Sequence, residues 1–188
     1  MFNKVYHHPL LTKEDLKTIR VAHTKVSFKK GAFLLREGQI TNEYLIVESG
    51  LIRSFVRDYN GNDITTNFFS TNEIVIEVSS LFQRIPTHEN IQALADCVCW
   101  KINFDDFQNL FHSIEGFSEW GRAWMAQSLF EFKQRSVTMI TDSATERYRK
   151  LIEEKPLVLQ NAPLKYIASY LGITDSSLSR IRKETAKL

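Results

Sequence analysis

Several side chains near the C-terminus have the types and spacing needed to contact nucleic acid. Four of them fall on one face of a predicted helix, because they recur every three or four residues. Serine, lysine and arginine side chains donate hydrogen bonds to phosphates, and an arginine can bind both acceptor atoms of a guanine edge. Two more lie near the N-terminal end of the helix and one at its edge. The candidate DNA-contacting residues are Asp175, Ser176, Ser177, Ser179, Arg180, Arg182 and Lys183.

The residues around this face predict two helices joined by a tight turn. Apolar side chains at helical spacing precede and follow the turn, and a small residue leaves room for the helices to cross closely. A glycine ends the first helix because it tolerates positive φ, and a threonine can cap the second. An ordinary helical hairpin with a solvated basic face is the alternative interpretation. The residues that match a helix-turn-helix are Ile167, Ala168, Leu171, Gly172, Ile173, Thr174, Leu178 and Ile181.

The charge distribution points the same way, although more weakly. Residues 143–188 carry 9 Lys and Arg against 5 Asp and Glu, whereas residues 1–142 carry 15 against 17. A basic end on a slightly acidic body favours a nucleic-acid partner. Such an excess also occurs in proteins that never bind DNA, so the pattern of residues decides more than the charge.

Residues 26–102 predict a β-rich domain. Short apolar or β-branched segments alternate with glycines, and Asn60-Gly61-Asn62 is typical of a β-hairpin turn. This spacing favours an antiparallel sandwich or roll over a parallel sheet. The predicted strands cover residues 32–35, 44–47, 51–56, 64–69, 74–78, 91–94 and 98–102.

Helices are predicted on both sides of the β region. One covers residues 11–22, with Thr12 as N-cap and Asp15 at the third helical position. Others cover residues 105–111 and 144–153, the latter with Ser143 as N-cap. We expect a loop between Pro156 and Pro163.

A longer helix is predicted from Ser118 to about Thr141, and it is apolar on two sides. A helix of this kind must be covered on both sides, either within its own domain or partly by a second subunit. One stripe holds Trp120, Trp124, Gln127 and Phe130. The other holds Met125, Leu129, Phe132 and Ile140.

Together these segments resemble the Crp/Fnr family of bacterial transcription regulators, in particular the branch common in Bacteroidetes. KGAFLLREG and the following YLIVESGLIR are similar to the opening of the family's cyclic-nucleotide-binding β-roll, and DYNGND to its glycine hairpin. SATERY and the segment from Leu164 to Arg182 are similar to its helix-turn-helix region. The matching segments are residues 30–38, 44–53, 58–63, 143–148 and 164–182.

The resemblance implies an α+β fold of three parts. Residues 1–116 would form a jelly-roll-like double-stranded β-helix as sensor, residues 117–142 a dimerisation helix and residues 143–188 the helix-turn-helix domain. Few residues follow Ile181, so we expect the family's wing to be missing or minimal. The implied partners are double-stranded DNA, a second copy of the chain, an unidentified small-molecule effector and RNA polymerase. The residues assigned to the dimer contact are Trp120, Trp124, Gln127 and Phe130.

The cassette that binds cyclic nucleotides in this family is altered. Its pattern is Phe-Gly-Glu-Leu followed by Pro-Arg-Ala/Ser-Ala; Glu77 matches the ribose-binding Glu, and Thr87 replaces the phosphate-binding Arg. A buried phosphate without a cation is costly, so cyclic AMP is disfavoured unless Arg84 reaches back. The alternatives are that the pocket binds another ligand or that the roll binds no ligand. No cofactor is expected. The candidate pocket residues are Glu77, Ser79, Ser80, Arg84, Thr87 and His88.

Other functional classes find little support. No Gly-x-Ser-x-Gly, His-Glu-x-x-His or P-loop occurs, so we expect no enzyme. Cys97 and Cys99 are too few for a four-cysteine zinc or iron–sulfur site, and their spacing on one strand face favours a structural role. The longest apolar run is four residues and no signal peptide is visible, so we expect a cytoplasmic protein. A signalling module that contacts other proteins is the remaining alternative.

Overall fold

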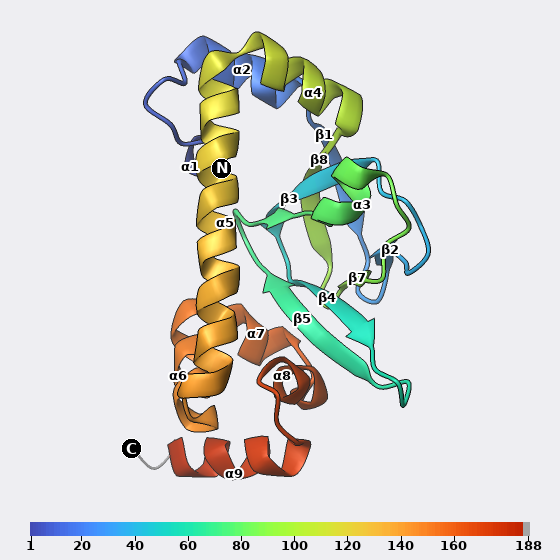
Figure 1. Ribbon diagram of the computed structural model, residues 1–188, viewed down its shortest axis with the longest axis vertical. Helices are drawn as coiled ribbons and strands as arrows, with labels where there is room; N and C mark the ends of the chain where they lie inside the picture. The colour runs from blue at the N-terminus through green and yellow to red at the C-terminus, as the bar shows by residue number, and fades with distance from the viewer. Residues whose placement is uncertain (186–188) are drawn as a thin grey trace.

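The computed structural model describes residues 1–185 and contains two four-stranded antiparallel sheets that form a roll (Figure 1). The strand orders are β1-β8-β3-β6 and β2-β7-β4-β5. An α+β fold with antiparallel sheets, as predicted, is therefore confirmed. The strands are β1 (Thr24–Phe28), β2 (Phe33–Leu35), β3 (Glu43–Ser49), β4 (Ile52–Arg57), β5 (Asp63–Phe69), β6 (Ile74–Val75), β7 (Asn90–Ala93) and β8 (Cys97–Asn103).

The inner faces of the two sheets share one apolar core. Val47 and Ile52 lie in it, as do both cysteines, which project from the same face of β8. Burial raises the pKa of both thiols, to about 12 for Cys99, so both stay protonated at neutral pH. Their environment is that of small core side chains and not that of a reactive pair.

The predicted strand at residues 74–78 is shorter than expected. Strand β6 ends at Val75, and Val78 already belongs to helix α3 (Val78–Gln83). The Glu77 carboxylate accepts a hydrogen bond from the Ser80 backbone N–H and caps this helix. Alternating apolar residues continue through both elements, so the pattern alone does not reveal where the strand ends.

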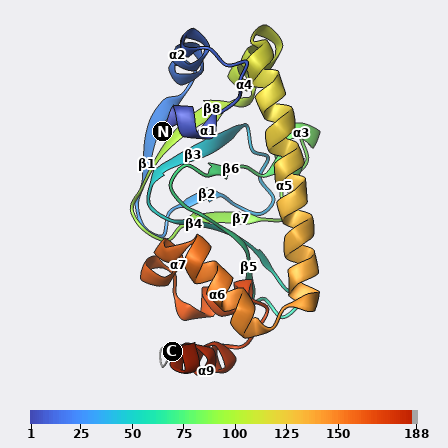
Figure 2. The same ribbon diagram turned by 90° about the vertical axis from the view of Figure 1, so that its left-hand side faces the viewer.

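A helical layer covers the outer face of the β1-β8-β3-β6 sheet (Figure 2). Predicted capping by Thr12 and Asp15 is confirmed, because each side chain bonds the backbone N–H of the other. Tyr6 and Phe117 are among the aromatic side chains that pack beneath these helices. The layer consists of α1 (Phe2–Val5), α2 (Lys13–Val21), α4 (Phe104–Ser113) and the first half of α5 (Glu115–Thr141).

Helix α5 is the predicted long helix, and its tryptophan stripe belongs to its own subunit. Trp120 is only 5% exposed, and its indole N–H donates to the Val5 carbonyl oxygen at 2.9 Å. Trp124 is half-buried against the same aromatic cluster. Because Trp120 is buried within its own subunit, its assignment to a dimer contact is wrong. A 3.6-residue period locates two apolar stripes but does not say which one meets the roll.

The opposite side of α5 is apolar and uncovered. Leu129, Phe132 and Ile140 are 70%, 71% and 86% exposed. Phe130, predicted in the tryptophan stripe, is 60% exposed and joins them, whereas Gln127 is exposed and donates to the Glu131 carboxylate. Within the described residues no helix, α5 included, is long and apolar enough to cross a membrane. The exposed stripe consists of Met125, Leu129, Phe130, Phe132, Val137 and Ile140.

Residues 143–185, which we call the C-terminal unit, fold into four helices. The predicted Ser143 cap is confirmed, because Ser143 and Glu146 form a reciprocal capping box. The expected loop between the prolines is instead helix α7, in which Pro156 occupies an N-terminal position that tolerates proline. The helices are α6 (Ala144–Glu154), α7 (Pro156–Asn161), α8 (Leu164–Tyr170) and α9 (Asp175–Thr185).

Candidate functional site

Helices α8 and α9 meet at a tight turn built by the residues that the sequence singled out. Gly172 has φ +66°, a backbone conformation that favours glycine, and its Cα faces the end of the Met139 side chain of α5. Ile167 and Leu178 are fully buried between the helices. Burying each of these side chains stabilises the pair by about 1.5–3 kcal/mol.

The first turn of α9 is fixed by side-chain capping. Thr174 accepts a hydrogen bond from the Ser177 backbone N–H at 3.2 Å, and its hydroxyl also lies 3.0 Å from the Ser177 hydroxyl. Ser177 is half-buried. Two of the seven candidate DNA-contacting residues thus contact the cap, because the Ser176 hydroxyl also lies 2.9 Å from that of Thr174. Ser177 is the one that binds the cap through its backbone N–H as well.

The other six candidates are exposed on α9. Ser176, Ser179, Arg180 and Lys183 share the face opposite Leu178 and Ile181, both of which are buried. Asp175 and Arg182 lie at its edge. In Figure 1, α9 is at the end of the molecule farthest from α2, and the rest of the chain leaves its outer face open. The family's wing, which we expect to be missing or minimal, would follow α9, and residues 186–188 lie outside the described part of the chain.

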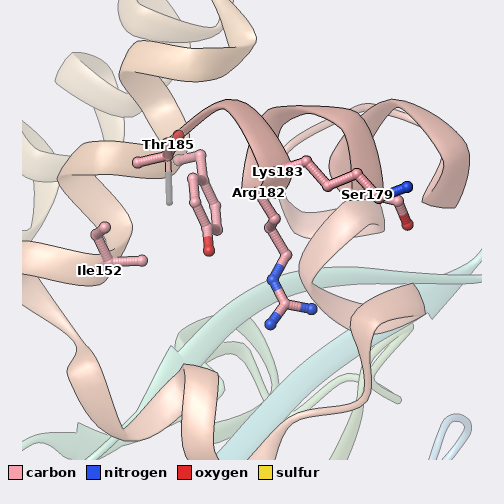
Figure 3. A pocket seen from close by; sticks show the side chains of 6 residues that line it. Ile152, Ser179, Arg182, Lys183 and Thr185 are labelled. Atoms are coloured by element: carbon pink, nitrogen blue, oxygen red, sulfur yellow. The ribbon is translucent and has the colours of Figure 1, made fainter. Parts of the chain in front are cut away.

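A shallow hollow of about 520 Å³ lies between α9 and α6 (Figure 3). Ile152 and Tyr148 form its apolar side, and the side chains of Arg182 and Lys183 line it from α9. Ser179 also borders it, so the candidate face and the hollow are continuous. The basic side chains can reach acceptors on either side of the helix.

The candidate effector pocket in the roll is not assembled as predicted. Glu77, Ser79 and Ser80 lie together, but they bond one another at the start of α3: Ser79 Oγ and the Ser80 N–H both donate to Glu77 at 2.6 Å. The Ser80 hydroxyl also accepts from the Thr41 backbone N–H. These groups fix the start of helix α3 and hold it against the loop that carries Thr41.

The remaining pocket candidates are directed elsewhere. Arg84 donates to the Thr41 carbonyl oxygen at 3.0 Å and to the Asn42 side chain, so its guanidinium ties down another loop. His88 is exposed. Thr87 is 1% exposed, and its backbone pairs with that of Gly38 and Gln39. The described residues place no cation at the position of the missing arginine.

Sequence reasoning missed Glu89. Its carboxylate accepts from the Thr66 hydroxyl at 2.9 Å, and Thr66 in turn bonds Ser54 at 2.7 Å. Burial raises its pKa, and the negative charge of Glu77 raises it further. The signal was present, because Glu89 takes the place of the final Ala in the Pro-Arg-Ala/Ser-Ala pattern. An acid thus replaces a small residue close to where a phosphate would lie.

A comparison by sequence matches part of the chain to a known family model. Residues 25–113 match the family model of the cyclic nucleotide-binding domain. The match spans the roll and a little under half of the whole chain. No curated protein matches the chain by sequence. Within the matched residues, Glu77 stands where the cassette pattern has its Glu, and Thr87 stands where it has its Arg.

Solved structures share the fold of nearly the whole chain. FixK2 from Bradyrhizobium japonicum superposes with a TM-score of 0.75 at 17% identity, covering 88% of this chain and 85% of that one. A transcriptional regulator of the Crp/Fnr family from Eubacterium rectale gives 0.71 at 18%, covering 97% and 88%. The catabolite activator protein of Thermus thermophilus gives 0.62 at 16%, covering 97% and 86%. At such identities the likeness concerns the fold, with a cyclic nucleotide-binding roll followed by a long helix.

Proposed function

We propose that the protein is a homodimeric, DNA-binding transcription regulator of the Crp/Fnr type. The observation that carries the proposal is the exposed face of α9, where serine and basic side chains project from a helix whose other side is locked into a tight turn. In a dimer, two such helices enter successive major grooves about 34 Å apart. The solved structures named above support the proposal through their shared fold and the regulatory role of the Eubacterium rectale protein.

Dimerisation is proposed through the exposed stripe of α5. Monomeric proteins rarely leave this much contiguous apolar surface in water. Met125, Leu129 and Phe132 follow a four–three spacing, which is the repeat by which two helices interlock side chains. We divide the chain at this helix, with the roll as sensor before it and the C-terminal unit as DNA-binding domain after it.

The DNA contact is tested by Arg180→Ala. On a site selected from random duplexes, we expect a loss of about 1–3 kcal/mol and relaxed preference at one base pair, because arginine can bind two guanine acceptors. Fluorescence anisotropy measures both. Arg20→Ala, on helix α2 at the opposite end of the molecule, is the matched control.

Two outcomes would count against this assignment. Equal losses on selected and random DNA would reduce Arg180 to a phosphate contact. DNA affinity depends steeply on salt when a protein neutralises phosphates. If the affinity of the wild-type protein for DNA does not fall as the salt concentration rises, DNA binding is excluded and a module that contacts other proteins is favoured.

The roll is not expected to bind cyclic AMP or cyclic GMP. Glu77 is retained, but Thr87 offers no positive charge and Glu89 adds a carboxylate nearby. A ligand present at about 100 times its dissociation constant would stabilise the fold by roughly 2.7 kcal/mol. We therefore expect no change in thermal unfolding at millimolar nucleotide.

The double variant Thr87→Arg/Glu89→Ala restores the Arg and the final Ala of the cassette pattern and tests the cause. A shift in this variant alone would show that the missing cation and the added acid exclude the nucleotide. A clear shift in the wild type would instead make cyclic nucleotide the effector.

A further inference from the structure

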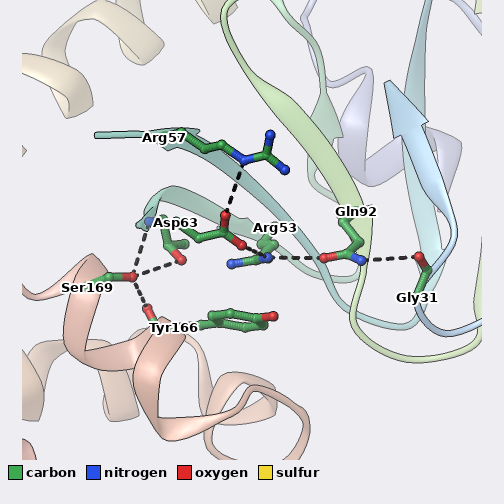
Figure 4. Close-up of polar contacts among 8 residues, drawn as sticks. Gly31, Arg53, Arg57, Asp63, Gln92, Tyr166 and Ser169 are labelled. Carbon is green, nitrogen blue, oxygen red and sulfur yellow. Dashed lines mark hydrogen bonds and ion pairs between the residues drawn. The ribbon is translucent and has the colours of Figure 1, made fainter. Parts of the chain in front are cut away.

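A buried arginine joins the roll to the C-terminal unit (Figure 4). Arg53 of β4 is 1% exposed, and its guanidinium carbon lies 3.9 Å from the Phe55 ring and 3.4 Å from the Tyr166 ring of α8. Its Nη2 donates to Asp63 at 2.8 Å and to Gln92 at 3.1 Å. We call these five residues the Arg53 latch. The cation is thus enclosed between strand β4 and a helix that are more than 100 residues apart in the chain.

Further contacts surround the latch. The Thr65 backbone N–H of edge strand β5 donates to the Ser169 hydroxyl of α8 at 3.1 Å. Lys155 forms an ion pair with Glu73 at 2.6 Å. Leu51, Phe68 and Leu94 of the roll pack into the apolar core of the C-terminal unit. The unit is therefore docked on the second sheet as well as connected to α5.

The latch has the features of a reversible contact. Nε and Nη1 of Arg53 have no hydrogen-bond partner among the described residues. Docking gains the cation–π contact with Tyr166 but withholds water from these donors, whereas separation would return water to them. Because these favourable and unfavourable contributions to the free energy of docking oppose each other, the chain can adopt both a docked and a separated arrangement.

The Arg53 latch is also connected to the interior of the roll, through strand β4, whose successive side chains project to opposite faces of the sheet. Ser54 follows Arg53 along β4 and projects to the opposite face, where it bonds Thr66 and, through it, Glu89. Glu89 is three residues before Gln92, which holds Arg53. The inner chain thus links β4, β5 and the residue that precedes β7, and β4, β5 and β7 are the three strands that carry the latch.

We propose that the Arg53 latch is a regulatory contact, and that the chain Ser54–Thr66–Glu89 inside the roll sets how firmly it holds the C-terminal unit. The second sheet then provides a connection from the roll interior to α8 that does not pass along α5. Only the consequence for DNA binding rests on the proposed function. A firmly held unit binds DNA better, because α9 loses less freedom on binding.

Amide hydrogen exchange at Thr65 reports docking, since its N–H bonds Ser169 across the interface. We expect Tyr166→Leu to speed this exchange at least tenfold and Tyr166→Phe, which keeps the ring, to leave it unchanged. Tyr59→Leu is the control, because Tyr59 lies 97% exposed in the same β4–β5 hairpin. Unchanged exchange in Tyr166→Leu would overturn the latch.

The inner chain is tested by Ser54→Ala and Glu89→Ala, which remove its two ends. Both are expected to speed Thr65 exchange about tenfold. Glu37→Ala, which changes an exposed glutamate after β2, is expected to leave it unchanged. If neither inner variant changes the exchange, the connection through the sheet is wrong. Two variants at different strands keep the test decisive should one fail to fold.

A cross-link separates the latch from the proposed function. In Thr65→Cys/Ser169→Cys, whose native hydroxyls lie 3.1 Å apart, oxidation fixes the docked arrangement. We expect Glu89→Ala to weaken DNA binding about tenfold in the reduced pair and to have no effect in the oxidised pair. An equal effect in both would overturn control through the latch. A protein that binds no DNA at all would refute the proposed function, while the exchange measurements would still decide the latch.

Discussion

Replacing Leu129 by glutamate is expected to convert the protein from a dimer to a monomer. Leu129 lies at the middle of the exposed α5 stripe and is 70% exposed in the single chain. In a helix pair it would be buried against its partner, where an unpaired carboxylate costs about 3–5 kcal/mol. The dissociation constant should therefore rise on the order of 1000-fold. Sedimentation equilibrium across a concentration series measures it.

Two further variants make this test specific. Gln134→Glu adds the same charge to an exposed position outside the stripe, so its dimer should survive. Trp124→Glu is expected to destabilise the subunit itself, because Trp124 packs on the aromatic cluster of the roll. A Leu129→Glu protein that stays dimeric at wild-type strength would place the dimer contact elsewhere.

Stability is expected to fall by about 3 kcal/mol as the pH drops from 7 to 4, through His23. Burial lowers the pKa of His23 to about 4, whereas an unfolded histidine titrates near 6.5. In the fold, Nδ1 donates to the Ile19 carbonyl oxygen at 2.6 Å, and Nε2 accepts from Tyr6. Between these two pKa values the unfolded chain binds the extra proton, so acid favours unfolding.

The variant His23→Gln isolates this contribution, because glutamine stays neutral. Its free energy of unfolding, measured in urea, should be lower at pH 7 but should change less between pH 6.5 and 4.5. His7→Gln, at an exposed position, should retain the wild-type slope. An equal slope in His23→Gln and the wild type would exclude His23 as the source.

The sequence predicts most of the local structure because its signals are short-range. Thr12 and Ser143 each cap a helix and are paired three residues later with an acid, and both capping boxes occur. The α8–α9 turn follows from Gly172 and the apolar residues on either side. Each of these signals depends only on neighbours within one or two helical turns.

The errors lie where distant parts of the chain decide the outcome. Helix α7 has only six residues between two prolines, and a helix that short depends on burial of Val158 against the rest of the unit. Trp120 and the exposed Leu129 are equally apolar in the sequence. Only the presence of the roll beside one of them distinguishes core from exposed surface.

The effector pocket was harder to predict than the α9 face. Positions on one helix share a face by spacing alone, so Ser179 and Lys183 could be grouped from the sequence. A pocket needs side-chain directions from several strands, and Arg84 turns away from it toward Thr41. The role of Glu89 depends on Thr66, 23 residues earlier in the chain.

The shared core of the roll and the C-terminal unit limits how this chain can be recombined. Leu51, Phe68 and Leu94 complete the packing around Ile167 and Leu171. A different sensor fused before α5 would leave these helices without one wall of their core. During divergence, substitutions on the outer face of the second sheet must therefore be matched by substitutions on the surface of α8. The roll and the C-terminal unit then evolve together as one docked pair and not as separate domains.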